Sequence, residues 1–251
     1  MGAAEKVEIM TLVTQRNALI TGASSGIGKA TALAFAASGI NLALVSRCEE
    51  KLEAVASAAR QTGVRVKVYP LDLANIDVVQ EKIRAIALDF GAIDILVNNA
   101  GMGYTGALSE TPLASWVSVI NLNLTSVFQC IMGVLPMMRE SEIGTIINVA
   151  SIAGQQVFPN WGAYCVSKAG LIALSKTLAA EERTNGIRVS AICPGAVNSE
   201  LWDTETVKVD FDRSVMLTPE IVAQIILHTA LLPQQAVIEE LTLMPSAGAL
   251  E

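Results

Sequence analysis

The chain has 251 residues and a formal net charge of −7, with 52% hydrophobic and 16% charged residues. This length suits one α/β domain with a sizeable core. The negative charge argues against a nucleic-acid partner, because binding to a phosphate backbone requires a basic face. We find no apolar run of the roughly 18–20 residues that span a bilayer. The polar start of the chain does not resemble a secretory signal, so we expect no membrane partner and no secretion.

Cysteine and histidine usage excludes further classes of protein. The cysteines are scattered without paired spacing, which fits reduced thiols and predicts a cytoplasmic location. His228 is the only histidine and no Cys-x-x-Cys occurs, so we expect no metal site. The large apolar fraction predicts burial between subunits, and therefore an oligomer.

A polar leader at 1–15 precedes one domain at 16–251, in which apolar runs alternate with helical patterns. The first half predicts, in chain order, a strand at 17–21, a helix at 26–38, a strand at 41–46, a helix at 49–62, a strand at 65–70, a helix at 76–90 and a strand at 93–98. The second half predicts a helix at 116–139, a strand at 144–149, a helix at 162–184, a strand at 187–193, a helix at 219–232 and a strand at 240–243. Pro136 is expected to bend the last turn of the 116–139 helix.

Strict alternation of strands and helices predicts the fold class. Strands that read as continuous apolar runs are typical of a parallel sheet covered on both faces. We therefore expect a single-domain, doubly wound α/β fold of the Rossmann type, with about seven strands. Ligands in such folds bind beyond the carboxyl ends of the strands, where the strand order reverses.

The segment TGASSGIG at 21–28 lies between the first strand and the first helix. Glycines let the backbone turn tightly and approach a phosphate, and the helix N-terminus adds free N–H groups and partial positive charge. The alternative is an ordinary tight turn between a strand and a helix. The strand–loop–helix context favours a dinucleotide site. Its expected cofactor-binding residues are Gly22, Ser24, Ser25, Gly26, Ile27 and Gly28.

The end of the second strand bears on the choice of cofactor. Ser46 and Arg47 stand where NAD enzymes usually have an acidic residue for the ribose 2′-hydroxyl. A hydroxyl and a guanidinium suit a 2′-phosphate, so we expect NADP(H) in preference to NAD(H). The alternative for Arg47 is a solvated loop cation. Asp72, after the third strand, is expected to bind the adenine amino group or, alternatively, to cap the following helix.

The third chemical signal is a set of hydroxyl, phenol and amine side chains. Tyr164 and Lys168 share one helix face because they are four positions apart. A nearby ammonium group lowers the pKa of a phenol, so we expect Tyr164 to act as a general acid/base near neutral pH. Ser151 follows the strand at 144–149 and is expected to hold the substrate oxygen. Asn123 could fix a water that relays protons to Lys168.

With these motifs the chain resembles the short-chain dehydrogenase/reductase family over about residues 15–248. The resemblance rests on TGASSGIG (21–28), Asp72, NNAG (98–101), Asn123 in NLNLTSVF, Ser151 in NVASIAG, YCVSK (164–168) and CPG (193–195). It implies a catalytic tetrad of Asn123, Ser151, Tyr164 and Lys168, and hydride transfer with NAD(P)(H). Further cofactor contacts implied are Leu73, Asn99, Ala100, Gly101, Tyr164, Lys168, Pro194, Gly195 and Val197. A homotetramer or homodimer is implied, for which we expect the helices at 116–139 and 162–184 to form the interface.

The leading hypothesis is an NADP(H)-dependent enzyme that interconverts a small carbonyl compound and its alcohol. The substrate-binding residues would be Ser151 and Tyr164, with Trp161 and Trp202 as pocket candidates or plain packing residues. A second hypothesis is a 3-oxoacyl-acyl-carrier-protein reductase. Glu142 and Asn185 fall where such reductases have the basic residues that meet the acidic carrier, which argues against docking. A third is a non-catalytic NADP(H)-binding sensor, which the complete tetrad disfavours.

Overall fold

The structure is a computed structural model that describes residues 15–209, 212–246 and 248. All but the last residue of the expected leader at 1–15 therefore lies outside the described residues. The predicted fold class is confirmed. A parallel seven-stranded sheet has the order β3-β2-β1-β4-β5-β6-β7. Its strands are β1 (Asn17–Thr21), β2 (Asn41–Ser46), β3 (Val66–Pro70), β4 (Ile95–Asn98), β5 (Gly144–Val149), β6 (Ile187–Pro194) and β7 (Glu240–Leu243).

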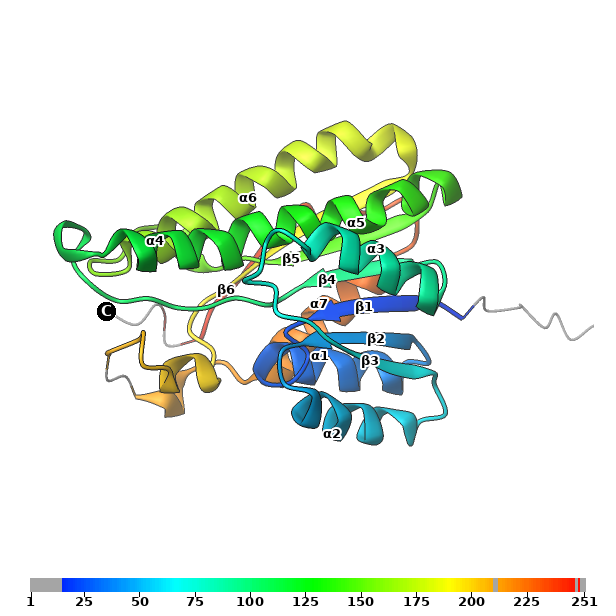
Figure 1. The fold of residues 1–251 in the computed structure, drawn as a ribbon, viewed down its shortest axis with the longest axis horizontal. Helices are drawn as coiled ribbons and strands as arrows, with labels where there is room; N and C mark the ends of the chain where they lie inside the picture. The colour runs from blue at the N-terminus through cyan, green and yellow to red at the C-terminus, as the bar shows by residue number, and fades with distance from the viewer. Residues whose placement is uncertain (1–14, 210–211, 247, 249–251) are drawn as a thin grey trace, which may run out of the picture.

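Helices cover both faces of this sheet (Figure 1). One layer holds α1 (Gly26–Ala37), α2 (Glu49–Arg60) and α7 (Pro219–Leu231). The other holds α3 (Val79–Phe90), α4 (Leu113–Ile120), α5 (Ser126–Ser141) and α6 (Gly162–Glu182). Short 3₁₀ turns lie at Leu108–Glu110, Ile152–Gly154, Arg183–Asn185, Glu200–Asp203 and Arg213–Val215.

Two apolar cores form because successive strand residues point to opposite faces. Leu19 of β1 packs into the core on the α3–α5–α6 side. Its neighbours Ala18 and Ile20 pack into the core on the α1–α2–α7 side. All three side chains are fully buried, which explains why the strand reads as an uninterrupted apolar run. The strand order reverses between β1 and β4, so the carboxyl ends of these strands form the expected binding edge.

Most predicted boundaries coincide with the observed ones, and most of the others differ by one to three residues, as is usual for frayed ends. The third helix was expected from residue 76, but it begins at Val79 because a turn precedes it. In that turn Asn75 N donates to Asp72 O, and Val78 N donates to Asn75 O. The fourth strand was expected from residue 93 and begins at Ile95.

The expected long helix at 116–139 is present as the longer helical stretch Leu113–Ser141, which is not α-helical throughout. The segment is α4, then a π-helical turn at Asn121–Thr125, then α5. In the π turn Ser126 N donates to Asn121 O, five residues back. Such wide turns frequently mark functional sites, and this one contains Asn123. Pro136 lies inside α5, which continues past it to Ser141; a bend at this proline stays a prediction.

The stretch Leu113–Ser141 is also long and apolar enough, by length and composition alone, to cross a membrane. Core helices of proteins without membrane spans pass the same test. One side of this stretch packs against α3 and α6. Packing in the core therefore accounts for part of its apolar character, and its other side exposes Leu113, Val117 and Phe128.

Buried polar side chains align the strands that carry the site. Asn98 Nδ2 at the end of β4 donates to Asn148 Oδ1 of β5 at 2.9 Å. Asn148 Nδ2 donates to Ser175 Oγ of α6 at 2.8 Å. Hydrogen-bonded buried amides are directional contacts that fix relative positions more narrowly than apolar packing does. This chain of bonds sets α6 against the central strands.

Candidate active site

The glycine loop between β1 and α1 forms the first wall of the site. Gly22 and Gly26 have positive φ angles of 64° and 49°, which glycine adopts without strain. A Cβ on Gly28 would lie 2.2 Å from the carbonyl oxygen of Gly22, so only glycine lets α1 begin this close to β1. The loop leaves the N-terminal turn of α1 open to a ligand, which fits a pyrophosphate.

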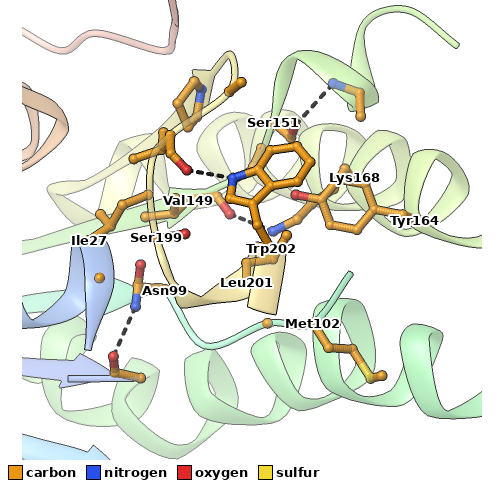
Figure 2. Close-up of a pocket in the computed structure, with 18 of the residues that line it drawn as sticks. Ile27, Asn99, Met102, Val149, Ser151, Tyr164, Lys168, Ser199, Leu201 and Trp202 are labelled. Carbon is orange, nitrogen blue, oxygen red and sulfur yellow. Dashed lines mark hydrogen bonds between the residues drawn. The ribbon is translucent and has the colours of Figure 1, made fainter. Parts of the chain in front are cut away.

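The loop after β4 is attached to the glycine loop by hydrogen bonds. Thr21 Oγ1 accepts from the backbone N–H groups of Asn99 at 3.0 Å and Ala100 at 3.1 Å. Asn99 Nδ2 donates back to the carbonyls of Thr21 and Gly22. Figure 2 shows this amide directed at the strand end. Two loops that are far apart in the sequence thus form one cradle.

The end of β2 provides an exposed cation beside this cradle. Arg47 is exposed and lines the same pocket as Gly22 and Gly26. Ser46 Oγ lies 2.8 Å from Ser24 Oγ, so two hydroxyls stand together next to Arg47. This arrangement suits a phosphate monoester.

Asp72 and Leu73, which follow β3, make contacts outside the pocket. Asp72 Oδ1 accepts from Ala74 N at 3.0 Å, within a turn, so the alternative that it caps the following helix is wrong: α3 begins at Val79 with Val78 as its N-cap. Leu73 is buried in the core. Neither residue lines the pocket, and the same is true of three further expected cofactor contacts: Ser24, Gly28 and Ser46.

Ser151, Tyr164 and Lys168 meet at the other end of the same pocket, which has a volume of about 360 Å³. Ser151 follows β5, and the other two lie one turn apart on α6, as their spacing predicts. Lys168 Nζ lies 5.6 Å from the centroid of the Tyr164 ring and donates to the carbonyl of Val149 at 2.8 Å. Figure 2 shows the two side chains directed to the same side of the pocket.

Burial controls the protonation of both α6 side chains. It raises the pKa of Tyr164 to about 12, against a smaller lowering by the Ser151 hydroxyl. It lowers the pKa of Lys168 to about 8. We expected Lys168 to bring the pKa of Tyr164 below its ordinary value. In the protein without coenzyme or substrate, this expectation is wrong. Loss of water around the phenol outweighs its neighbours, because desolvation penalises the charged form.

Asn123 does not line the pocket. Its Oδ1 accepts from Met102 N at 2.8 Å. Its Nδ2 donates to Met102 O at 2.9 Å and to Ser167 Oγ at 3.1 Å. Both amide hydrogens are thus used within the protein, so its side chain holds the 101–103 backbone beside Lys168 and has no spare donor for a water. Its place in the catalytic tetrad stays a prediction.

The substrate end has aromatic and aliphatic walls. The two tryptophan candidates, Trp161 and Trp202, both line it. Sequence reasoning missed several lining residues, chiefly Met102, Phe158, Ser199, Glu200, Leu201 and Met244. Part of this wall comes from the segment after β6, whose position depends on pairing with residues 103–106 and is not visible in local patterns. The expected contacts Pro194, Gly195 and Val197 do line the pocket.

Comparison with known proteins agrees with this geometry. The family model described as short chain dehydrogenase matches residues 16–209. A 3-oxoacyl-[acyl-carrier-protein] reductase from Synechocystis sp. is 38% identical over 195 residues, which cover 77% of this chain and 79% of that protein. The chain belongs to the short-chain dehydrogenase/reductase family.

Two solved structures from this family show the same fold. An alcohol dehydrogenase from the archaeon Thermococcus sibiricus, complexed with 5-hydroxy-NADP, has a TM-score of 0.86 and 29% identity. That match covers 94% of this chain and 99% of the archaeal chain. A metagenomic short-chain oxidoreductase in complex with NADP has a TM-score of 0.81 and 30% identity, covering 92% and 97% of the two chains. The protein is therefore an oxidoreductase of the family, acting on alcohol and carbonyl groups.

The buried amine of Lys168 predicts a pH dependence of stability. Its pKa is lowered from 10.5 to about 8 on folding, so the folded state binds a proton less readily than the unfolded chain. The resulting penalty is complete below pH 8 and absent above pH 10.5. Relative to Lys168→Met, the wild type should therefore gain up to about 3 kcal/mol of unfolding free energy as pH rises through this range.

Urea unfolding of both proteins between pH 7.5 and 10.5 measures this gain. The exposed-lysine variant Lys51→Met is the control and should follow the wild type. A difference between wild type and Lys168→Met that does not vary with pH would contradict the lowered pKa of the buried amine.

Proposed function

We propose that this chain reduces a ketone or aldehyde to the alcohol with NADPH, and catalyses the reverse oxidation, with Tyr164 as the general acid/base. In the forward direction a carbonyl compound, NADPH and a proton give an alcohol and NADP⁺. The observation that carries the proposal is that Ser151, Tyr164 and Lys168 line the same pocket as the glycine loop and Arg47.

Each residue has a role that follows from its chemistry. A coenzyme held by the glycine loop and Arg47 would supply the hydride for the carbonyl carbon. The Tyr164 hydroxyl gives its proton to the carbonyl oxygen, and the Ser151 hydroxyl donates a hydrogen bond to the same oxygen. A pKa of about 12 keeps Tyr164 protonated at neutral pH. The developing alkoxide is a stronger base than a phenolate, so proton donation is favourable. Lys168, held by Val149, adds positive charge beside the phenol when it is protonated.

This role predicts the effect of removing one oxygen atom. Tyr164→Phe should reduce ketone turnover by at least about 10²-fold, because a general acid contributes at least that much. NADPH binding, measured by fluorescence titration, should be retained. The matched control is Tyr69→Phe, since Tyr69 of β3 donates to Asp89 of α3 and does not line the pocket. Unchanged turnover in Tyr164→Phe would refute the acid/base role. A wild type that binds NADPH without any turnover would favour the non-catalytic sensor.

We propose NADP(H) as the preferred coenzyme. The support is the exposed guanidinium of Arg47 and the Ser24–Ser46 hydroxyl pair beside it, together with the NADP complexes of the two similar structures. A carboxylate at the end of β2, which would repel a 2′-phosphate, is not present in this sequence.

Arg47→Ala should raise the Kd for NADPH about tenfold, the effect of losing one charge-assisted hydrogen bond. The Kd for NADH should change little, because NADH has no 2′-phosphate. Arg84→Ala, on the exposed side of α3, is the matched control. An equal loss of affinity for both coenzymes in Arg47→Ala would contradict this assignment.

Reduction of 3-oxoacyl groups on a carrier protein is the second candidate, and the names of the curated relatives favour it. The surface expected to meet an acidic carrier argues against it. Glu142 directly follows α5 and lies beside Gly186, the residue after Asn185. A Cβ on Gly186 would lie 2.0 Å from the Glu142 carbonyl oxygen. The nearby cations are engaged, Arg139 with Glu182 and Arg183 with Glu239. Turnover of free ketones but not of acetoacetyl thioesters would decide for the first candidate.

We propose that the protein is a homotetramer or homodimer that associates through residues 116–139 and 162–184. Supporting this, α4, α5 and α6 expose the large apolar side chains of Leu113, Val117, Phe128 and Val166. Exposed apolar patches of this kind mark association sites. A cytoplasmic location is part of the same proposal, since the four cysteines in the described part of the chain are free thiols.

Phe128→Asp places a charge on this face and should reduce the mass measured by light scattering to that of a smaller assembly. Leu88→Asp is the control, because Leu88 is also an exposed apolar side chain but lies on α3. A monomeric wild type, or an unchanged mass in Phe128→Asp, would exclude these helices as the interface.

A further inference from the structure

The apolar end of the pocket is a separate cluster, distinct from the two cores of the sheet. Ala153, Trp161, Cys165 and Val207 form its buried part. Phe158, Tyr164, Leu201 and Trp202 pack against them. The phenol that acts on the substrate oxygen therefore belongs to the same cluster as two tryptophans and a phenylalanine.

The rings of this cluster are held in fixed orientations. Trp161 packs edge to face on Tyr164, with ring centroids 5.4 Å apart and an interplanar angle of 64°. It packs in the same manner on Trp202, at 5.8 Å and 74°. Trp202 Nε1 donates to the carbonyl of Val197 at 2.7 Å, and Figure 2 shows its indole beside Tyr164. The polar edge of the indole is thus engaged with the backbone, which holds the ring in place over the pocket.

The segment that carries Trp202 is joined to the loop after β4. Thr105 N donates to Thr206 O at 2.8 Å, and Thr206 Oγ1 donates to Gly103 O at 2.7 Å. Lys208 N donates to Thr105 Oγ1 at 2.8 Å. A Cβ on Gly103 would lie 2.6 Å from the Val207 side chain. These contacts fix the wall, and a preformed wall binds a rigid ligand without the entropic loss of ordering a loop.

Charge is distributed unevenly along the pocket. Of the described residues that line it, the charged ones are Arg47, Glu200 and Lys168. Arg47 lies at the coenzyme end, and a Cβ on Gly26 would lie 3.4 Å from Glu200 Oε2. Lys168 is 5% exposed and bonds to Val149. Apart from Lys168, which is held at Val149, the described residues that line the aromatic end include no cation for a carboxylate or phosphate on the substrate, and burying such an anion without a partner is strongly unfavourable.

We infer that the substrate is an uncharged carbonyl compound, or its alcohol, with an aryl or similarly flat apolar group on the reacting carbon, held by Phe158, Trp161 and Trp202. Aromatic rings attract one another in edge-to-face and offset arrangements beyond the effect of apolar area alone. A flat ring on the substrate would extend the row of packed rings formed by Trp202, Trp161 and Tyr164. The substrate carbonyl would then lie beside Ser151 and Tyr164. This inference rests on the proposed carbonyl reduction and names its substrate class.

The first experiment compares three methyl ketones with NADPH. Acetophenone carries the aryl group, cyclohexyl methyl ketone is its saturated match, and 4-acetylbenzoate adds a carboxylate. We expect kcat/KM for acetophenone to exceed that for the saturated ketone by about 10-fold. It should exceed that for 4-acetylbenzoate by at least about 100-fold. Equal rates for the first two, or preference for the carboxylate, would overturn the inference.

Variants locate the preference in the structure. In Trp161→Leu the ratio of kcat/KM between acetophenone and cyclohexyl methyl ketone should fall to about 1, whereas Trp161→Phe should keep most of it. Trp116→Phe is the matched control and should keep the wild-type ratio, because Trp116 lies on α4 and does not line the pocket. Thermal stabilisation by NADP⁺ checks that each variant is folded. An unchanged ratio in folded Trp161→Leu would remove this ring from substrate recognition.

A binding measurement separates this inference from the proposed reaction. In Tyr164→Phe loaded with NADP⁺, acetophenone should quench tryptophan fluorescence, and 4-acetylbenzoate should not. Quenching by acetophenone without reduction of any carbonyl by the wild type would refute the proposed function and keep the aromatic site. Reduction of aliphatic ketones without this quenching would keep the function and refute the aromatic site.

Discussion

The hydrogen bond from Lys168 Nζ to the carbonyl of Val149 is the contact on which the rest of the site depends. It joins the middle of α6 to the end of β5 at 2.8 Å. A buried amine needs such a partner, because an unpaired polar group in an apolar interior is costly. The bond fixes the rotation of α6 about its axis. Tyr164, one turn earlier, is then directed to the same edge of the sheet as Ser151.

The same edge receives the coenzyme cradle because the strand order reverses between β1 and β4. Thr21 and Asn99 bond the two loops that leave these strands. The buried Asn98–Asn148–Ser175 chain sets β4, β5 and α6 against one another. Cradle and acid/base residues are therefore positioned by one connected set of polar bonds, in which Asn123 holds Met102 at the margin.

The fold could be predicted from local pattern because parallel strands buried on both faces are continuous apolar runs between glycine-ended helices. The i, i+4 spacing also placed Tyr164 and Lys168 on one face, since a regular helix has only one geometry. Their protonation could not be read in this way. It depends on burial, to which the segment after β6 contributes Leu201 and Trp202 through tertiary contacts. The π turn at Asn121–Thr125 likewise has no sequence signature, because it differs from an α-helix by a single hydrogen-bond register.

The most direct test is a crystal structure of the protein with NADP⁺. The central claim under test is that one pocket orients the coenzyme toward the Tyr164 hydroxyl. We predict the nicotinamide ring beside Ser151 and Tyr164, the pyrophosphate over the glycine loop at 22–28, and the 2′-phosphate on Arg47. A coenzyme whose nicotinamide lies outside the reach of Tyr164, or an α6 rotated so that Tyr164 and Lys168 point away from the pocket, would contradict the account.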